Sequence, residues 1–145
     1  MREVVLIDGL RTPIGKFGGA LRDWTAQAMQ AHVFHELLAR VALDPTLIDE
    51  VIVGNVQQGS DAVNIGRASM LLAGLPVRTT GYAVHRNCAS GIQSNTSAVQ
   101  AVNSDDGELF LVGGTESMSN IPYILKKARW GYKLRHAELT DALWE

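Results

Sequence analysis

Four short apolar runs divide the chain, and turn residues bound each of them. They are residues 4–7 (VVLI), 51–53 (VIV), 82–84 (YAV) and 109–112 (LFLV). The first, second and fourth runs show no alternation of polar and apolar residues, which is typical of strands covered on both faces of a parallel sheet. The pattern therefore predicts four strands, one at each run.

Two amphipathic stretches between these runs predict helices. Residues 25–41 carry apolar side chains at spacings of four, which indicates one face turned to the core. This predicted stripe comprises Met29, Val33, Leu37 and Val41. Asp23 or Thr25 can cap the start of the helix. Residues 64–73 predict a second, shorter helix, which Gly74 ends.

A third stretch, residues 88–103, predicts a helix without a single charged residue and with many small ones. A surface helix normally has a charged face, so a helix that lacks one is usually buried all round. Gly91 inside it costs roughly 1 kcal/mol relative to alanine, and a close contact should compensate for this cost. We therefore predict a central helix packed between layers. By itself, the chain should expose an apolar face that a further layer would cover.

Strands and helices alternate from residue 4 to residue 112. This order predicts an α/β fold with a mostly parallel sheet, right-handed crossovers and helices on both faces. After residues 113–114 (GG) the pattern dissolves, and only a weak helical signal follows over residues 138–144. A chain of 145 residues is long enough for one hydrophobic core.

Composition restricts the classes of function. With 13 Lys+Arg against 15 Asp+Glu, the net charge of -2 gives no basis for nucleic-acid binding. The apolar runs are too short for a membrane span or a signal-peptide core, so we expect neither. The single cysteine, Cys88, excludes an internal disulfide and a multi-cysteine zinc site, and it predicts a reducing, cytoplasmic compartment.

Cys88 lies where the predicted strand at 82–84 turns into the uncharged helix. The positive end of a helix dipole and the free N–H groups of its first turn favour a thiolate there, and Arg86 could add positive potential. The same N–H groups could stabilise an oxyanion when the sulfur attacks a carbonyl. On these grounds alone, a buried structural cysteine is the commoner alternative.

Five ordered segments resemble the sequence motifs of thiolases, the acyl-CoA-dependent condensing enzymes. Residues 85–91 (HRNCASG) are similar to the nucleophile loop of that family. The other segments are residues 10–19 (LRTPIGKFGG), 49–56 (DEVIVGNV), 113–120 (GGTESMSN) and 127–132 (KARWGY). The resemblance extends over essentially the whole chain, in register.

This resemblance implies an acyltransferase that works through an acyl-cysteine intermediate, with Cys88 as its nucleophile. Coenzyme A thioesters would be its substrates, with no permanently bound cofactor, no metal and no assigned cofactor-binding residue. Residues 1–119 would form the amino-terminal core of four strands and three helices, and residues 120–145 would begin a lid-like loop domain. The family places a second cysteine and a histidine in a carboxy-terminal half, so the fold and the site would be incomplete here. Homo-oligomers, formed through the sheet near the third predicted strand, are also implied.

Other residues and functions give weaker predictions. His85 stands where thiolases often have asparagine, and it invites a role as base to Cys88. His32 and His35 lie three positions apart, but a solvated helix face explains them better than a metal does. Glu116 is best interpreted as a carboxylate that anchors a loop. The alternative functions are a non-catalytic assembly module of the same fold and a cysteine thioester hydrolase.

Overall fold

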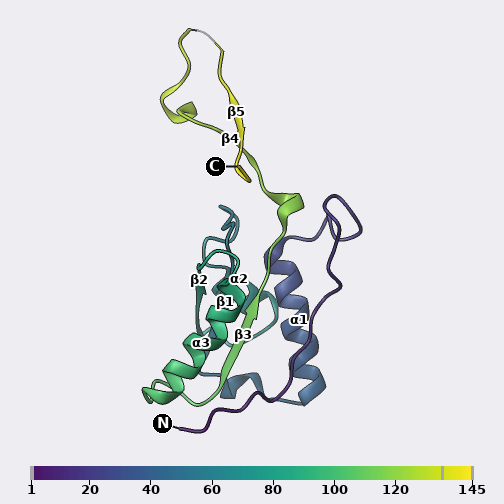
Figure 1. The fold of residues 1–145 in the computed structure, drawn as a ribbon, viewed down its shortest axis with the longest axis vertical. Helices are drawn as coiled ribbons and strands as arrows, with labels where there is room; N and C mark the ends of the chain where they lie inside the picture. Colours follow the sequence, from purple (N-terminus) through teal and green to yellow (C-terminus); the bar gives the residue numbers. More distant parts are fainter. Residues whose placement is uncertain (1, 135, 145) are drawn as a thin grey trace.

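The computed structural model describes residues 2–134 and 136–144, and its centre is a three-stranded parallel sheet (Figure 1). The strands are β1 (Glu50–Gly54), β2 (Thr80–Val84) and β3 (Phe110–Gly114). Their spatial order is β2-β1-β3, in a register that sets Gly54 beside both Val84 and Gly114. The carboxyl ends of the three strands therefore meet at one edge. The predicted strands at the second, third and fourth apolar runs are confirmed.

Helices cover both faces of this sheet, which confirms the predicted α/β architecture. They are α1 (Ala26–Val41), α2 (Ile65–Leu72) and α3 (Ser90–Asn103). The N-cap side chains are Thr25, which accepts from the Ala28 N–H at 3.3 Å, and Asn64, which accepts from the Arg67 N–H at 3.0 Å. Helices α1 and α2 pack together, whereas α3 packs against β1 and β3 (Figure 1). In the described part of the chain, no helix has the length and apolar character needed to cross a bilayer.

The core is centred on β1, whose three apolar residues 51–53 are fully buried. Phe34 and Leu38 of α1 pack into this core. The predicted stripe of α1 is confirmed in part, because Met29 is buried and Leu37 packs against the core. Val33 and Leu37 are only half-buried, and the most deeply buried positions of the helix lie one residue further on, at Phe34 and Leu38.

The first apolar run, residues 4–7, is not a strand, so the sheet has three strands where the sequence predicted four. Its exposed fractions are 70% at Val5, 80% at Leu6 and 67% at Ile7. The segment is held at its ends, where the Arg2 N–H donates to Asn103 Oδ1 at 2.9 Å and Asp8 pairs with Arg40 at 3.0 Å. An apolar run becomes a strand only beside a partner, and no described strand pairs with this one.

Helix α3 is covered on one side only by the described residues, as the sequence predicts for this chain taken by itself. Its outer face is exposed and carries no charge. The exposed residues of this face are Ile92, Asn95, Thr96, Val99, Gln100 and Asn103. Ile92 is 74% exposed, although isoleucine is among the residues most often buried.

Beyond β3 the chain forms an extended hairpin that projects away from the sheet (Figure 1). Its strands are β4 (Tyr123–Leu125) and β5 (Leu139–Asp141), which pair antiparallel. The weak helical signal over residues 138–144 is therefore wrong, because pairing with β4 decides the local structure. Three short 3-10 turns complete the elements: η1 (Pro45–Leu47), η2 (Met118–Asn120) and η3 (Ala128–Trp130).

Candidate active site

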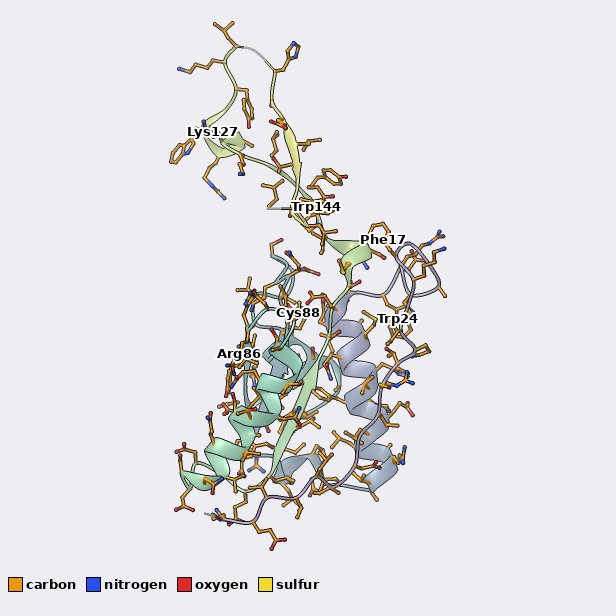
Figure 2. All side chains as sticks on the ribbon, in the orientation of Figure 1. Phe17, Trp24, Arg86, Cys88, Lys127 and Trp144 are labelled. Carbon is orange, nitrogen blue, oxygen red and sulfur yellow. The ribbon has the colours of Figure 1, made fainter. Side chains whose placement is uncertain are left out.

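Cys88 lies on the tight turn that joins β2 to α3, at the edge where the strands end (Figure 2). Its thiol is free and the residue is exposed. Asn87, just before it, has a left-handed φ of +47°, a conformation that asparagine tolerates better than most residues. Ligand sites of open α/β sheets lie at this carboxyl edge. The thiol is therefore accessible at the place where the fold class favours a site.

Backbone N–H groups lie beside this thiol. Two hydrogen bonds close the turn, from the Ala89 N–H to the Arg86 carbonyl at 3.1 Å and from the Ser90 N–H to the Asn87 carbonyl at 3.0 Å. Among the described residues, no acceptor takes the N–H of Cys88 or of Gly91. Unpaired N–H groups at a helix start are the donors that a developing oxyanion requires.

Glycines let the first turn of α3 rest directly on the ends of β1 and β3. A Cβ atom at Gly54 would collide with the backbone carbonyl of Ser90. At Gly114, a Cβ atom would lie 3.1 Å from the Cα of Gly91. The close approach therefore requires glycine at positions 54 and 114, whereas a Cβ atom at Gly91 would meet only the Gly114 Cα, at 4.0 Å, so the contact expected to explain Gly91 is not found there. The side chain of Ser94 adds a hydrogen bond to the Gly113 carbonyl at 2.9 Å. The sheet therefore fixes where the N-terminus of α3 lies.

Neither side chain that precedes the turn is bound to the thiol. His85 Nδ1 accepts from the Asn87 N–H at 3.5 Å, and no hydrogen bond joins His85 to Cys88 in the part of the chain that the structure describes. The Arg86 guanidinium donates to Gln93 Oε1 at 2.5 Å, in the first turn of α3. The geometry therefore gives no support to His85 as the base of Cys88.

Glu116 anchors the loop after β1, which confirms the structural role predicted for it. Its carboxylate accepts from Asn55 Nδ2 at 2.9 Å, from the Val56 N–H at 2.9 Å and from the Gln57 N–H at 3.0 Å. Three donors from consecutive residues hold this side chain in place. Glu116 thus joins the ends of β1 and β3 and is fully engaged in doing so.

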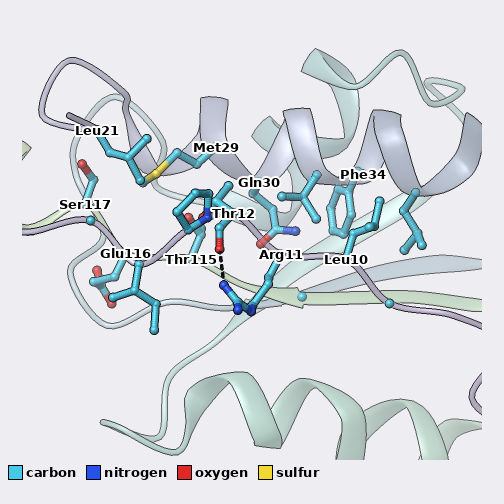
Figure 3. Close-up of a pocket in the computed structure, with 18 of the residues that line it drawn as sticks. Leu10, Arg11, Thr12, Leu21, Met29, Gln30, Phe34, Thr115, Glu116 and Ser117 are labelled. Atoms are coloured by element: carbon cyan, nitrogen blue, oxygen red, sulfur yellow. Dashed lines mark hydrogen bonds between the residues drawn. The ribbon is translucent and has the colours of Figure 1, made fainter. Parts of the chain in front are cut away.

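A cavity lies away from Cys88, beneath the amino-terminal segment and against α1 and the end of β3 (Figure 3). Its volume is about 600 Å³, and its walls include Leu10, Met29 and Phe34. The Arg11 guanidinium lies here and donates to the Thr12 carbonyl at 3.1 Å. Cys88 does not line this cavity, so the cavity and the thiol are separate features.

The two histidines of α1 form no recognisable metal centre. The His32 ring lies 5.7 Å from the Trp24 ring, tilted by 56°, and His35 is exposed. No group of three or more His, Cys, Asp or Glu residues suited to a metal ion occurs among residues 2–134 and 136–144. The tilted contact with the Trp24 ring is the interaction that the structure shows for His32.

Comparison with known families supports the resemblance seen in the motifs. Residues 4–145 match the family model described as the N-terminal domain of thiolase. The chain belongs to the thiolase family. Acetyl-CoA acetyltransferase of Syntrophomonas wolfei is 39% identical to this thiolase chain over 133 residues, which are 92% of the chain and 34% of the relative. The 3-oxoadipyl-CoA/3-oxo-5,6-dehydrosuberyl-CoA thiolase of Escherichia coli is 43% identical over 143 residues, or 97% of the chain and 35% of the relative.

Solved structures show the same fold. A crystal structure of Bacillus anthracis acetyl-CoA acetyltransferase matches with a TM-score of 0.88 and 40% identity, over 94% of this chain and 34% of that one. The thiolase chain therefore has the predicted fold class and belongs to a family of enzymes. It spans about a third of the length of the relatives it matches.

Proposed function

We propose that this thiolase chain supplies the nucleophile of an acyltransferase that moves acyl groups between coenzyme A thioesters. The observation that carries the proposal is the exposed thiol of Cys88, on a fixed turn beside unpaired backbone N–H groups. The names of the relatives, which include an acetyl-CoA acetyltransferase and a 3-oxoadipyl-CoA thiolase, support the substrate class. Coenzyme A thioesters enter as substrates, so this chemistry asks for no permanently bound cofactor.

In the first step, the thiolate sulfur of Cys88 attacks the carbonyl carbon of an acyl-CoA thioester. The carbonyl oxygen takes the negative charge, and N–H groups at the start of α3 stabilise it. The carbon–sulfur bond to coenzyme A then breaks, the carbonyl forms again, and coenzyme A leaves as a thiolate that takes up a proton. The product is an acyl-cysteine, and this intermediate divides one difficult transfer into two easier steps.

The second step transfers the acyl group from Cys88 to an acceptor and needs a further acid or base. The chain contains one cysteine, and His85 has no hydrogen bond to it within the described residues. We therefore propose that a carboxy-terminal half, as in the family, contributes the acid–base groups. In this proposal residues 1–119 form the core, and residues 120–145 begin the lid that covers the coenzyme.

Self-association through β2 is part of the same proposal. This strand is at the edge of the sheet, with β1 on one side and no described strand on the other. An unpaired edge is a template for pairing with a second copy. A reducing, cytoplasmic compartment is also proposed, because a nucleophilic thiol must stay unoxidised to work.

The direct test is to mix the full chain with acetyl-CoA and measure its intact mass. We expect the mass to increase by one acetyl group. Peptide mapping should place this group on residue 88, and Cys88→Ser should abolish it under conditions in which only thiols are acetylated. Iodoacetamide should alkylate Cys88 in the folded chain, because its thiol is free and exposed. A wild-type chain that gains no acetyl group would overturn the proposal and favour a non-catalytic assembly module.

A hydrolase would give a different product pattern. Release of free acetate without exchange between two coenzyme A pools would favour a cysteine thioester hydrolase. His85→Ala provides the matched variant, since a hydrolase with His85 as its base would lose acylation in it. The proposed transferase should keep it, because His85 contacts the backbone of the turn and not the thiol.

A further inference from the structure

Ser90 is the first residue of α3 and lies two positions after the proposed nucleophile. It is 4% exposed, although its neighbours Cys88 and Ala89 are both exposed. Its hydroxyl oxygen accepts from the Arg86 N–H at 2.8 Å, and its O–H donates to the Asn87 carbonyl at 2.6 Å. One buried hydroxyl therefore binds both residues that lead into Cys88.

The turn depends on this hydroxyl for a bond that no other described residue supplies. The backbone bonds of the turn use the N–H groups of Ala89 and Ser90, so neither satisfies the Arg86 N–H. Among the described residues, the Ser90 hydroxyl is the acceptor for that group. It also binds the carbonyl of Asn87, the residue with the left-handed φ, and so restrains the least favourable conformation of the turn.

The sheet also fixes the position of Ser90. Its backbone carbonyl lies against Gly54 at the end of β1, with no room between them for a side chain. A chain of contacts therefore runs from β1 through Ser90 to the turn that carries Cys88. Through these contacts, the rigid sheet sets the position of an exposed thiol.

We propose that Ser90 is a positioning residue for Cys88. Its hydroxyl fixes the turn so that the thiol and the N–H groups beside it face the same thioester carbonyl. This inference rests on the proposed function, because it assigns Ser90 a role only if Cys88 is acylated. Ser90 does not itself touch the substrate.

Two reactions of Cys88 separate positioning from mere stability. Acylation by a thioester needs the sulfur and the oxyanion donors in one fixed arrangement, whereas alkylation by iodoacetamide is a displacement at saturated carbon without an oxyanion. Loss of the Ser90 hydroxyl should therefore slow acylation much more than alkylation. Misplacement of a reacting group by about 1 Å costs about 100-fold in rate, and we expect a loss of that order.

The experiment compares Ser90→Ala with wild type in the full chain, with acetyl-CoA and iodoacetamide as probes and rates expressed per folded molecule. Ser117→Ala is the matched control, because that hydroxyl also donates to one backbone carbonyl, of Trp24, and accepts from one donor, the side-chain amide Nδ2 of Asn120. We expect slow acylation and near-normal alkylation in Ser90→Ala, with both rates normal in Ser117→Ala. Ser90→Thr, which keeps the hydroxyl, should restore acylation.

A second variant covers the case in which Ser90→Ala does not fold. Ser90→Cys keeps the volume but offers a weak donor and a weak acceptor, and peptide mapping distinguishes residue 88 from residue 90. We expect the same selective loss of acylation on Cys88. Equal acylation in wild type and in the variants, or equal losses of both reactions, would overturn the role of Ser90 and leave the proposed function intact. A wild-type chain that is not acylated would instead overturn the proposed function itself.

Discussion

Two apolar runs with nearly the same sequence have opposite fates in this thiolase chain. Residues 51–53 (VIV) are fully buried as the central strand of the sheet, whereas residues 4–7 (VVLI) are mostly exposed and pair with no described strand. Each run is followed closely by a glycine, Gly54 in one case and Gly9 in the other. Composition and local pattern therefore do not explain the difference.

The difference lies in the neighbours of each run. Residues 51–53 have β2 on one side, β3 on the other and helices on both faces, so backbone and side chains are both satisfied. Among the described residues no strand pairs with residues 4–7, and the hydrogen bond and ion pair that hold this segment lie beyond its two ends, at Arg2 and Asp8. A strand in a sheet requires a hydrogen-bonded partner strand, and the sequence of one apolar run specifies only one of the two partners.

The largest expected contrast is between Ile52→Ala and Leu6→Ala. Ile52 is fully buried and Leu6 is 80% exposed, so truncation leaves a cavity only at residue 52. We expect Ile52→Ala to lower the free energy of unfolding by about 2–5 kcal/mol. Leu6→Ala should stay within about 0.5 kcal/mol of wild type. Urea unfolding of the full chain measures both, and a large loss in Leu6→Ala would show that residues 4–7 are buried in solution.

The two glycines give the next contrast. A Cβ atom at Gly54 would collide with the Ser90 carbonyl, whereas nothing lies within 4 Å of one at Gly9. We expect Gly54→Ala to cost about 1–3 kcal/mol in unfolding free energy through overpacking. It should also slow acylation of Cys88, since α3 must move. Gly9→Ala serves as the control, and equal urea midpoints for the two variants would contradict the close approach of α3 to β1.

Substitutions of the two aspartates that flank these runs should differ less in their effect on the free energy of unfolding. The N–H groups of Glu108 and Leu109 donate to Asp49 Oδ2 at 2.7 and 3.0 Å, and these bonds lower the pKa of Asp49 below its ordinary value of 3.8. Asp8, a half-buried carboxylate paired with the exposed Arg40 at 3.0 Å, is the site for comparison. Because Asp49 is exposed, we expect Asp49→Ala to cost only about 1 kcal/mol, and Asp8→Ala less.

The pH dependence tests the same carboxylate. The pKa of Asp49 is lower in the folded chain than its ordinary value of 3.8, which applies to the unfolded chain. The ionised carboxylate therefore stabilises the fold fully at pH values above 3.8. This contribution is lost as the pH falls through the folded-state pKa. Urea midpoints measured from pH 6 down to pH 3 should therefore converge for wild type and Asp49→Ala, and a constant difference would contradict the assignment.

The smallest effect on stability concerns the outer face of α3, which resembles residues 4–7 in having apolar side chains without cover. Ile92→Lys should change the unfolding free energy by less than about 0.5 kcal/mol, because Ile92 is 74% exposed. It should, however, lower the fluorescence of the dye ANS bound to residues 1–145, since it breaks up an apolar surface. Cooperative unfolding of wild type without dye binding would contradict the expectation that this face needs a further layer.

Much of the candidate site could be predicted from the sequence because it depends on local signals. Cys88 stands at a strand-to-helix junction, and its motif identifies the family without any coordinates. The role of Glu116 as an anchor was also predictable from its place after a strand. The role of Ser90 could not be predicted from the sequence, because its hydrogen bonds depend on the left-handed φ of Asn87 and on the contact with Gly54. Its one signal was a small polar residue within an uncharged helix.

The sequence by itself determined the family, the three helices, three of the four predicted strands and the nucleophile candidate, because each rests on periodicity, capping or a continuous motif. Tertiary structure alone decided that no described strand pairs with residues 4–7, that Phe34 and Leu38 are buried more deeply than Val33 and Leu37, and that residues 139–141 pair as a strand. The physical reason is the same in each case. Burial and strand pairing are relations between distant segments, and a local pattern records only what one segment offers to them.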